Sequence, residues 1–125
     1  MGKILLLDQV DSTPTVTPTT SVQVLQTDTI GSNPYAYIEA KYLCSIEQTG
    51  TSAAQTLTFN ITVNGVVSKA YVFKTYAVLK YDIVEFSAAE PAKEGGVVKL
   101  ELAAAAGADA QTSIIVKRVQ IEGNN

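Results

Sequence analysis

Apolar and polar side chains alternate most clearly in residues 54–64. From Leu57 onward every second residue is apolar and the intervening ones are Thr or Asn: Leu57, Phe59, Ile61 and Val63 against Thr58, Asn60, Thr62 and Asn64. A period of two residues is that of a β-strand with one buried face. Asn64-Gly65 follows, and this dipeptide favours a type I′ hairpin turn. The pattern therefore predicts a hairpin whose returning strand covers residues 66–74.

Shorter runs of the same character predict the remaining strands. They are separated by turn residues and cover residues 21–27, 35–47, 81–87, 97–103 and 113–122. In the last two we expect these residues to face the core: Val98, Leu100, Leu102, Ile114, Val116 and Ile121. Residues 103–110 include four consecutive Ala, which favour helix, but Gly107 and the flanking strands favour a strand end and a loop. We expect the final Gly123-Asn-Asn to fray.

Seven or eight short strands without a long helix predict an all-β fold. The spacing is typical of an antiparallel β-sandwich, jelly-roll-like in its connections. The 125 residues fit a single domain with one core. We therefore expect a β-sandwich domain over residues 21–125, preceded by an extended N-terminal arm over residues 1–20.

The first 20 residues differ in composition from the rest. A short apolar run, Ile4 to Leu7, precedes a Thr-rich stretch in which Pro14 and Pro18 favour extended backbone. The segment is either a linker or first edge strand, or an arm that packs on a neighbouring subunit and so removes four aliphatic side chains from water. The run is too short for a signal-peptide core or a membrane span. Candidate subunit or partner contacts are Ile4, Leu5, Leu6, Leu7, Val10, Val16, Tyr35 and Tyr37.

The composition removes most catalytic chemistry. The chain has no His, which excludes Ser-His-Asp triads and histidine-ligated zinc, and its one Cys excludes an internal disulfide. Cys44 lies in an apolar strand, so we expect it to be buried and inert. Glu39, Glu47, Glu85, Glu101 and Glu122 fall at outward strand positions, and no pair among them is marked as catalytic. We expect no enzyme activity, no catalytic residues, no metal and no cofactor.

Charge and aromatic content limit the classes of partner that the chain can bind. Nine Lys and Arg against twelve Asp and Glu give a net charge of −3, and the Lys residues are scattered, so we expect neither a nucleic acid nor a membrane as partner. Tyr35 and Tyr37 share a strand face by two-residue spacing, whereas Tyr42 falls on the other. Tyrosine joins an apolar ring to a polar tip, which suits core edges and also carbohydrate or protein surfaces.

Several segments together resemble those of small virion structural proteins of tailed bacteriophages. They are the Thr-rich residues 15–20, the loop 30–34, the strand 35–47, residues 50–54 before the alternating strand 57–65, and the closing residues 113–121. The resemblance covers about residues 15–123 and is shared by head decoration proteins and tail-fibre heads. It implies a jelly-roll-like domain that forms homotrimers on a virion.

The decoration type implies a cement protein that binds between capsid subunits. Its partners would be the major capsid protein or other virion proteins, and it would be made in the host cytoplasm and located on the capsid surface. The alternative is a receptor- or glycan-binding head domain of a tail fibre or spike. In that case the Tyr-rich strand over residues 35–47 would be the binding face.

Overall fold

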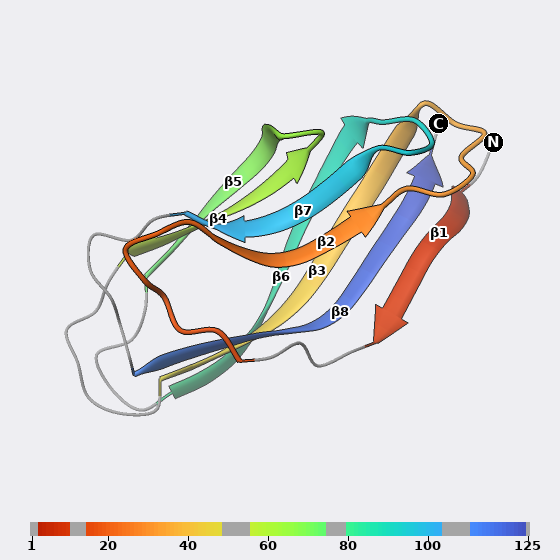
Figure 1. The fold of residues 1–125 in the computed structure, drawn as a ribbon. Helices are drawn as coiled ribbons and strands as arrows, with labels where there is room; N and C mark the ends of the chain where they lie inside the picture. Colours follow the sequence, from red (N-terminus) through yellow and green to blue (C-terminus); the bar gives the residue numbers. More distant parts are fainter. Residues whose placement is uncertain (1–2, 11–14, 49–55, 75–79, 104–110, 125) are drawn as a thin grey trace.

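The computed structural model shows two β-sheets packed face to face (Figure 1). It describes residues 3–10, 15–48, 56–74, 80–103 and 111–124. All secondary structure in these residues is β-strand: β1 Lys3–Val10, β2 Gln23–Thr29, β3 Tyr37–Gln48, β4 Thr56–Val63, β5 Val66–Lys74, β6 Lys80–Pro91, β7 Val97–Leu102 and β8 Thr112–Asn124. The described residues contain no helix long and apolar enough to cross a membrane. The predicted all-β fold is confirmed.

The strand order is that of a jelly roll. Sheet A has the order β1-β8-β3-β6 and sheet B the order β2-β7-β4-β5, with every pair antiparallel. Consecutive strands alternate between the two sheets, except for the β4–β5 hairpin. This double Greek-key arrangement confirms the predicted jelly-roll-like sandwich.

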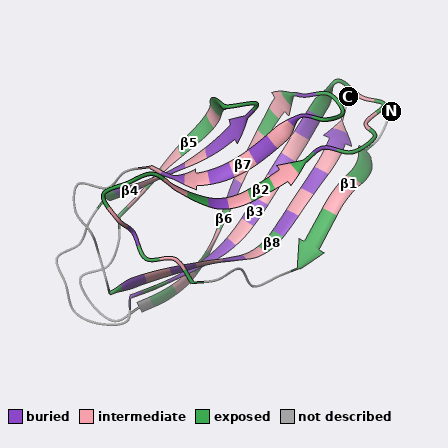
Figure 2. Ribbon diagram, in the orientation of Figure 1, coloured by how far each residue is buried: buried purple, intermediate pink, exposed green. Residues whose placement is uncertain are grey.

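The core lies between the sheets and follows the alternation of the sequence. The four apolar residues of β4 are all buried, as are the three predicted inner residues of β7. Phe59 of β4 stacks on Phe86 of β6 with ring centroids 4.5 Å apart, which joins the two sheets. Figure 2 shows the resulting alternation of buried and half-buried residues along β3, β7 and β8. Burial of these side chains is the main stabilising contribution.

The β4–β5 turn adopts the predicted geometry. Asn64 and Gly65 both have positive φ, 51° and 83°, as a type I′ turn requires. The Asn64 side-chain oxygen accepts a hydrogen bond from the Val97 N–H at 2.9 Å. The turn is therefore also tied to the first residue of β7.

An irregularity in β8 explains how its three predicted core residues can all face inward although their spacing departs from a period of two. Ile114, Val116 and Ile121 are all buried, although Val116 and Ile121 are an odd number of positions apart. The register with β3 shifts between Leu43 and Cys44, so one extra residue of β8, Lys117, is accommodated as a bulge. The bulge restores the inward orientation of the following alternate residues.

Four strands extend beyond their predicted ends: β2 to Thr29, β3 to Gln48, β6 to Pro91 and β8 to Asn124. β6, predicted over residues 81–87, continues to Pro91 because residues 88–91 keep pairing with β3. The prediction that the C-terminal residues fray is wrong for residues 123–124. Gly123 is buried and pairs with Ile4 on one side and Ile38 on the other. β8 has a strand on each side, which holds its end in place. Residues 104–110, part of the segment predicted as strand end and loop, lie outside the described residues.

The N-terminal segment is built into the sandwich. Residues 3–10 form β1, the edge strand of sheet A, paired with β8. Val16 makes an isolated bridge to Ile114, with two main-chain hydrogen bonds of 2.9 and 2.8 Å. Of the alternatives drawn from sequence, the first edge strand describes residues 3–10. Contact of this segment with another subunit stays a prediction.

Candidate functional site

The outer face of sheet A carries a shallow hollow of about 110 Å³ across three strands. It is lined by Lys41 and Leu43 of β3, Glu85 of β6, and Arg118 and Gln120 of β8. Strand register explains this convergence, because Arg118, Leu43 and Glu85 lie in one cross-strand row and Gln120 and Lys41 in the next. The hollow thus has an aliphatic centre with polar groups around it.

Ion pairs hold the two cations of the hollow in place. The Arg118 guanidinium donates two hydrogen bonds to Asp8 of β1, from Nε to Oδ1 at 2.9 Å and from Nη2 to Oδ2 at 2.8 Å. This bidentate contact lowers the pKa of the Asp8 carboxyl. The Lys41 ammonium lies 3.1 Å from Oε1 of Glu39, and hydrogen bonding to this carboxylate raises the pKa of Lys41. Both cations therefore stay charged and oriented over the physiological pH range.

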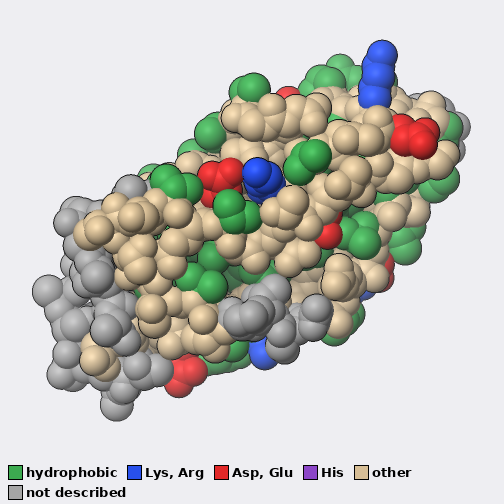
Figure 3. All heavy atoms as spheres, in the orientation of Figure 1, with side chains coloured by type: hydrophobic (Ala, Val, Ile, Leu, Met, Phe, Trp, Pro, Cys, Tyr) green, Lys and Arg blue, Asp and Glu red, His purple; other side chains and the backbone are tan. Residues whose placement is uncertain are grey.

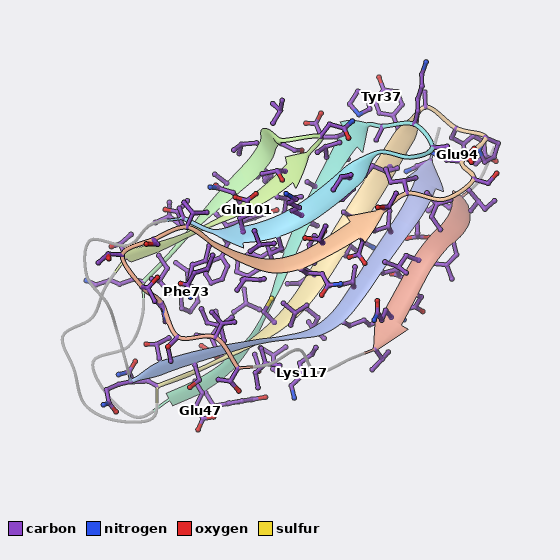
Figure 4. The ribbon with its side chains drawn as sticks, viewed as in Figure 1. Tyr37, Glu47, Phe73, Glu94, Glu101 and Lys117 are labelled. Atoms are coloured by element: carbon purple, nitrogen blue, oxygen red, sulfur yellow. The ribbon has the colours of Figure 1, made fainter. Side chains whose placement is uncertain are left out.

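Exposed tyrosines stand at the two ends of the same face. Tyr37, 50% exposed, precedes Lys41 by four residues on β3, and Tyr81, 53% exposed, precedes Glu85 by four residues on β6. Because β3 and β6 are antiparallel, the two rings lie on opposite sides of the hollow; Tyr81 pairs with Glu47. Figure 4 shows Tyr37 and Glu47 at opposite ends of β3. Each tyrosine is about 13 Å along its strand from the hollow, at ~3.3 Å per residue.

We call this surface the sheet A row. It consists of Tyr37, Lys41, Leu43, Glu85, Arg118, Gln120 and Tyr81. The outer face of sheet B differs, because it has no exposed tyrosine among the described residues. Figure 3, which has sheet B in front, shows charged side chains there in small groups among apolar ones.

The structure places the candidate residues of the sequence in four different surroundings. Tyr37 lies in the sheet A row, whereas Tyr35 precedes β3, is half-buried and donates its N–H to the Asn33 side chain at 3.0 Å. Leu6, Leu7 and Val16 pack partly buried against the core. The others remain exposed on β1: Ile4, Leu5 and Val10. The candidates therefore do not form one site.

Sequence reasoning did not select the five residues that line the hollow. Lys41 and Leu43 lie four and six residues after Tyr37, an even spacing that puts them on the same face, so the alternation of residues 35–47 carries a signal for them. Glu85 was assigned to a solvated outer face, which is where it lies. The bulge at Lys117 brings Arg118 opposite Leu43, and no local pattern marks that register.

Two titratable side chains, those of Cys44 and Tyr42, lie inside the sandwich. Cys44 is fully buried, as predicted, and burial raises the pKa of its thiol to about 12. Tyr42 is also fully buried, and desolvation raises the pKa of its hydroxyl. No group of three or more His, Cys, Asp or Glu side chains suited to a metal ion occurs in the part of the chain that the structure describes.

No protein-family model matches the chain, and no curated protein matches it. Among solved structures it is similar to the EclA C-terminal domain, described as a sugar-binding protein, over 89% of this chain and 79% of that one, with a TM-score of 0.56 and 13% identity. It is also similar to part of BtGH115A, a family GH115 4-O-methyl-α-glucuronidase with specificity for decorated arabinogalactans (TM-score 0.51, 10% identity, 98% of this chain).

A third similar structure is dimeric latent PorU from Porphyromonas gingivalis, with a TM-score of 0.51, 8% identity and coverage of 96% of this chain. The chain spans only 18% of the glucuronidase and 12% of PorU. At such identities the comparisons show a shared fold. The chain thus has a β-sandwich fold that also occurs in a sugar-binding domain and within larger proteins.

Proposed function

We propose that this protein is a carbohydrate-binding module that holds a glycan along the sheet A row. The observation that carries the proposal is the hollow itself, where an aliphatic floor is surrounded by oriented donors and acceptors and flanked by two exposed tyrosines. This is the tyrosine-bearing face of β3 that the glycan-binding alternative of the sequence required. No catalytic step is proposed.

The side chains of the hollow match the chemistry of a sugar. Pyranose rings present hydroxyls that both donate and accept hydrogen bonds, together with faces of C–H groups. Lys41 and Arg118 donate, the carboxylate of Glu85 accepts, and the amide of Gln120 does both. Leu43 offers apolar contact, and each tyrosine can stack its ring on a sugar face.

The cationic side chains of the hollow are already ordered in the free protein, which lowers the entropy cost of binding a ligand. Asp8 and Glu39 already hold the two cations, so little side-chain freedom remains to be lost when a ligand arrives. Tyr81 pairs with Glu47, ten residues from Tyr37, so the tyrosines are about 33 Å apart along the strands, which accommodates an oligosaccharide of several rings. We therefore expect affinity to rise with chain length until the glycan reaches both tyrosines.

Charge favours a neutral glycan. The row contains two cations and one carboxylate, but both cations are paired with further carboxylates on the same face. A polyanionic sugar would gain little from cations that are already neutralised, and it would approach Glu85. The similarity to a domain described as a sugar-binding protein supports the proposal through the shared fold.

The test is binding of neutral oligosaccharides, first on a glycan array and then by isothermal titration calorimetry with the best ligand. Lys41→Ala should weaken binding at least tenfold, as expected for loss of a charged hydrogen bond. The matched control is Lys99→Ala, which removes the same half-exposed side chain from the outer face of sheet B and should leave affinity unchanged. Absence of binding to any neutral glycan, or equal affinities of the two variants, would contradict the proposal.

A capsid-decoration function is the second candidate, and the exposed aliphatic residues of β1 favour it. Leu5 and Val10 are 55% and 79% exposed, which suits contact with another protein. Cosedimentation with purified phage capsids tests this function. Leu5→Lys tests this contact better than deletion of residues 1–20 does, because the deletion would remove β1 and expose the edge of β8. Failure of the intact protein to bind capsids would remove this candidate.

A further inference from the structure

The outward edge of β1 differs from the other three sheet edges. β5 and β6 lie against each other, joined by hydrogen bonds between Tyr71 and Ser87. β2 carries two Gln, two Thr and one Asp beside Val24 and Leu25, so polar side chains predominate on it. β1 has only aliphatic residues between Lys3 and Asp8, and its main-chain groups on one side have no strand partner in sheet A. An exposed apolar edge of this kind favours strand pairing with another chain.

Two copies of β1 placed antiparallel to each other would have complementary side chains. A cation, four aliphatic residues and an anion follow one another from Lys3 to Asp8. These two residues are five positions apart, so a regular strand would place them on opposite faces. The register shift between Leu5 and Leu7 places an extra residue there, and both charges lie on the outer face, where they pair with Glu39 and Arg118.

We propose that two copies of this protein associate through antiparallel pairing of their β1 strands. In this arrangement Lys3 of each copy lies opposite Asp8 of the second copy, and the aliphatic residues meet in between. Charges of alternating sign would then cross the junction on the outer face: Arg118 and Asp8 of one copy, then Lys3 and Glu39 of the second. Opposite charges directly across from each other stabilise strand pairs.

The symmetry and strength of the association follow from this geometry. Pairing of a strand with its own copy is two-fold and closed, so it gives a dimer rather than the trimer implied by the resemblance. One eight-residue strand pair is at the low end of protein interfaces. We therefore expect a dimer that dissociates on dilution through the micromolar range.

The dimer would join both copies of sheet A into one continuous sheet. Both hollows would then open on the same side, because the two-fold axis is perpendicular to that sheet. Two linked sites raise the apparent affinity for a polyvalent surface without any new contact. Dimerisation itself does not depend on the proposed sugar binding, so each can fail without the other.

A charge swap tests the pairing. Sedimentation velocity across a protein concentration series should show dimer for the wild type, whereas K3E and D8K, each alone, should raise the dissociation constant at least tenfold by opposing like charges. An equimolar mixture of K3E and D8K restores both pairs and should dimerise as the wild type does. Circular dichroism checks that each variant is folded.

A second pair of variants tests the pairing without touching these charges. L5K places lysines beside the two-fold axis and should abolish the dimer. V72K also replaces an exposed aliphatic residue by lysine, but on β5, the edge of sheet B, and should leave the dimer intact. The proposal would be overturned if the wild type were a monomer at all concentrations or a trimer. It would also be overturned if V72K weakened the dimer as much as L5K does. A mixture of the charge variants that stays monomeric would overturn it as well.

Discussion

The hydroxyl of Tyr71 on β5 donates a hydrogen bond to the main-chain carbonyl of Ser87 on β6, and it accepts one from the Ser87 N–H at 3.3 Å. The two strands belong to different sheets, so this residue pair joins the edges of the sandwich. The Tyr71 ring also lies 5.2 Å from that of Phe86, beside the aromatic stack of the core. One side chain thus closes this side of the domain through both polar and apolar contacts.

Tyr71→Phe should destabilise the fold by about 1 kcal/mol, because it removes the hydroxyl and leaves the half-buried Ser87 main chain without these bonds. Urea denaturation measures the free energy of unfolding. Tyr37→Phe is the control, since its ring is half exposed on the outer face, and we expect no change in stability there. Equal effects of both substitutions would show that the link between Tyr71 and Ser87 contributes nothing specific.

Gly123→Ala should cost about 1–3 kcal/mol by overpacking. A Cβ at Gly123 would lie 2.3 Å from Oδ1 of Asn33 and 2.8 Å from Cγ2 of Ile4. Asn33 also accepts the N–H of Tyr35 and donates to the Ala92 carbonyl, so its displacement would loosen the segment before β3. The midpoint of chemical denaturation reports the loss. Gly31→Ala, where a Cβ meets nothing within 4 Å, should show none.

Stability should fall above about pH 9. Burial raises the pKa of the Cys44 thiol to about 12 and also raises that of the Tyr42 hydroxyl. Above the ordinary pKa of each group, the unfolded chain releases a proton that the folded chain keeps, so rising pH favours unfolding. Each group contributes up to about 1.4 kcal/mol per pH unit. Cys44→Ala should show a shallower decline between pH 9 and 11; an unchanged slope would refute the assignment.

The proposed sugar binding should be constant between about pH 5 and pH 9. The Arg118 hydrogen bonds hold the pKa of Asp8 below its ordinary value, and Glu39 raises that of Lys41. The ion pairs that orient the hollow therefore persist through this range, and Asp8 loses its charge only as the pH falls below its lowered pKa. Calorimetric titrations at several pH values measure this. A midpoint of affinity near pH 6 or 7 would contradict the assigned site.

The sequence alone determined the architecture and much of the core. Two-residue alternation located the strands and named their buried residues, and Asn64-Gly65 specified its turn, because both depend on neighbours along the chain. The same alternation fixed which side chains of β3 face outward. It left the order of strands in each sheet open, since pairing joins residues far apart in sequence.

Tertiary structure decided the position of β1 and the composition of the hollow. Ile4 to Leu7 could have belonged to a free arm or an edge strand, and only pairing with β8 distinguishes the two for residues 3–10. The hollow depends on the bulge at Lys117, which sets Arg118 beside Leu43. A shift of one residue turns every following side chain to the other face, so a single irregularity that local pattern does not mark determined which charges meet on the surface.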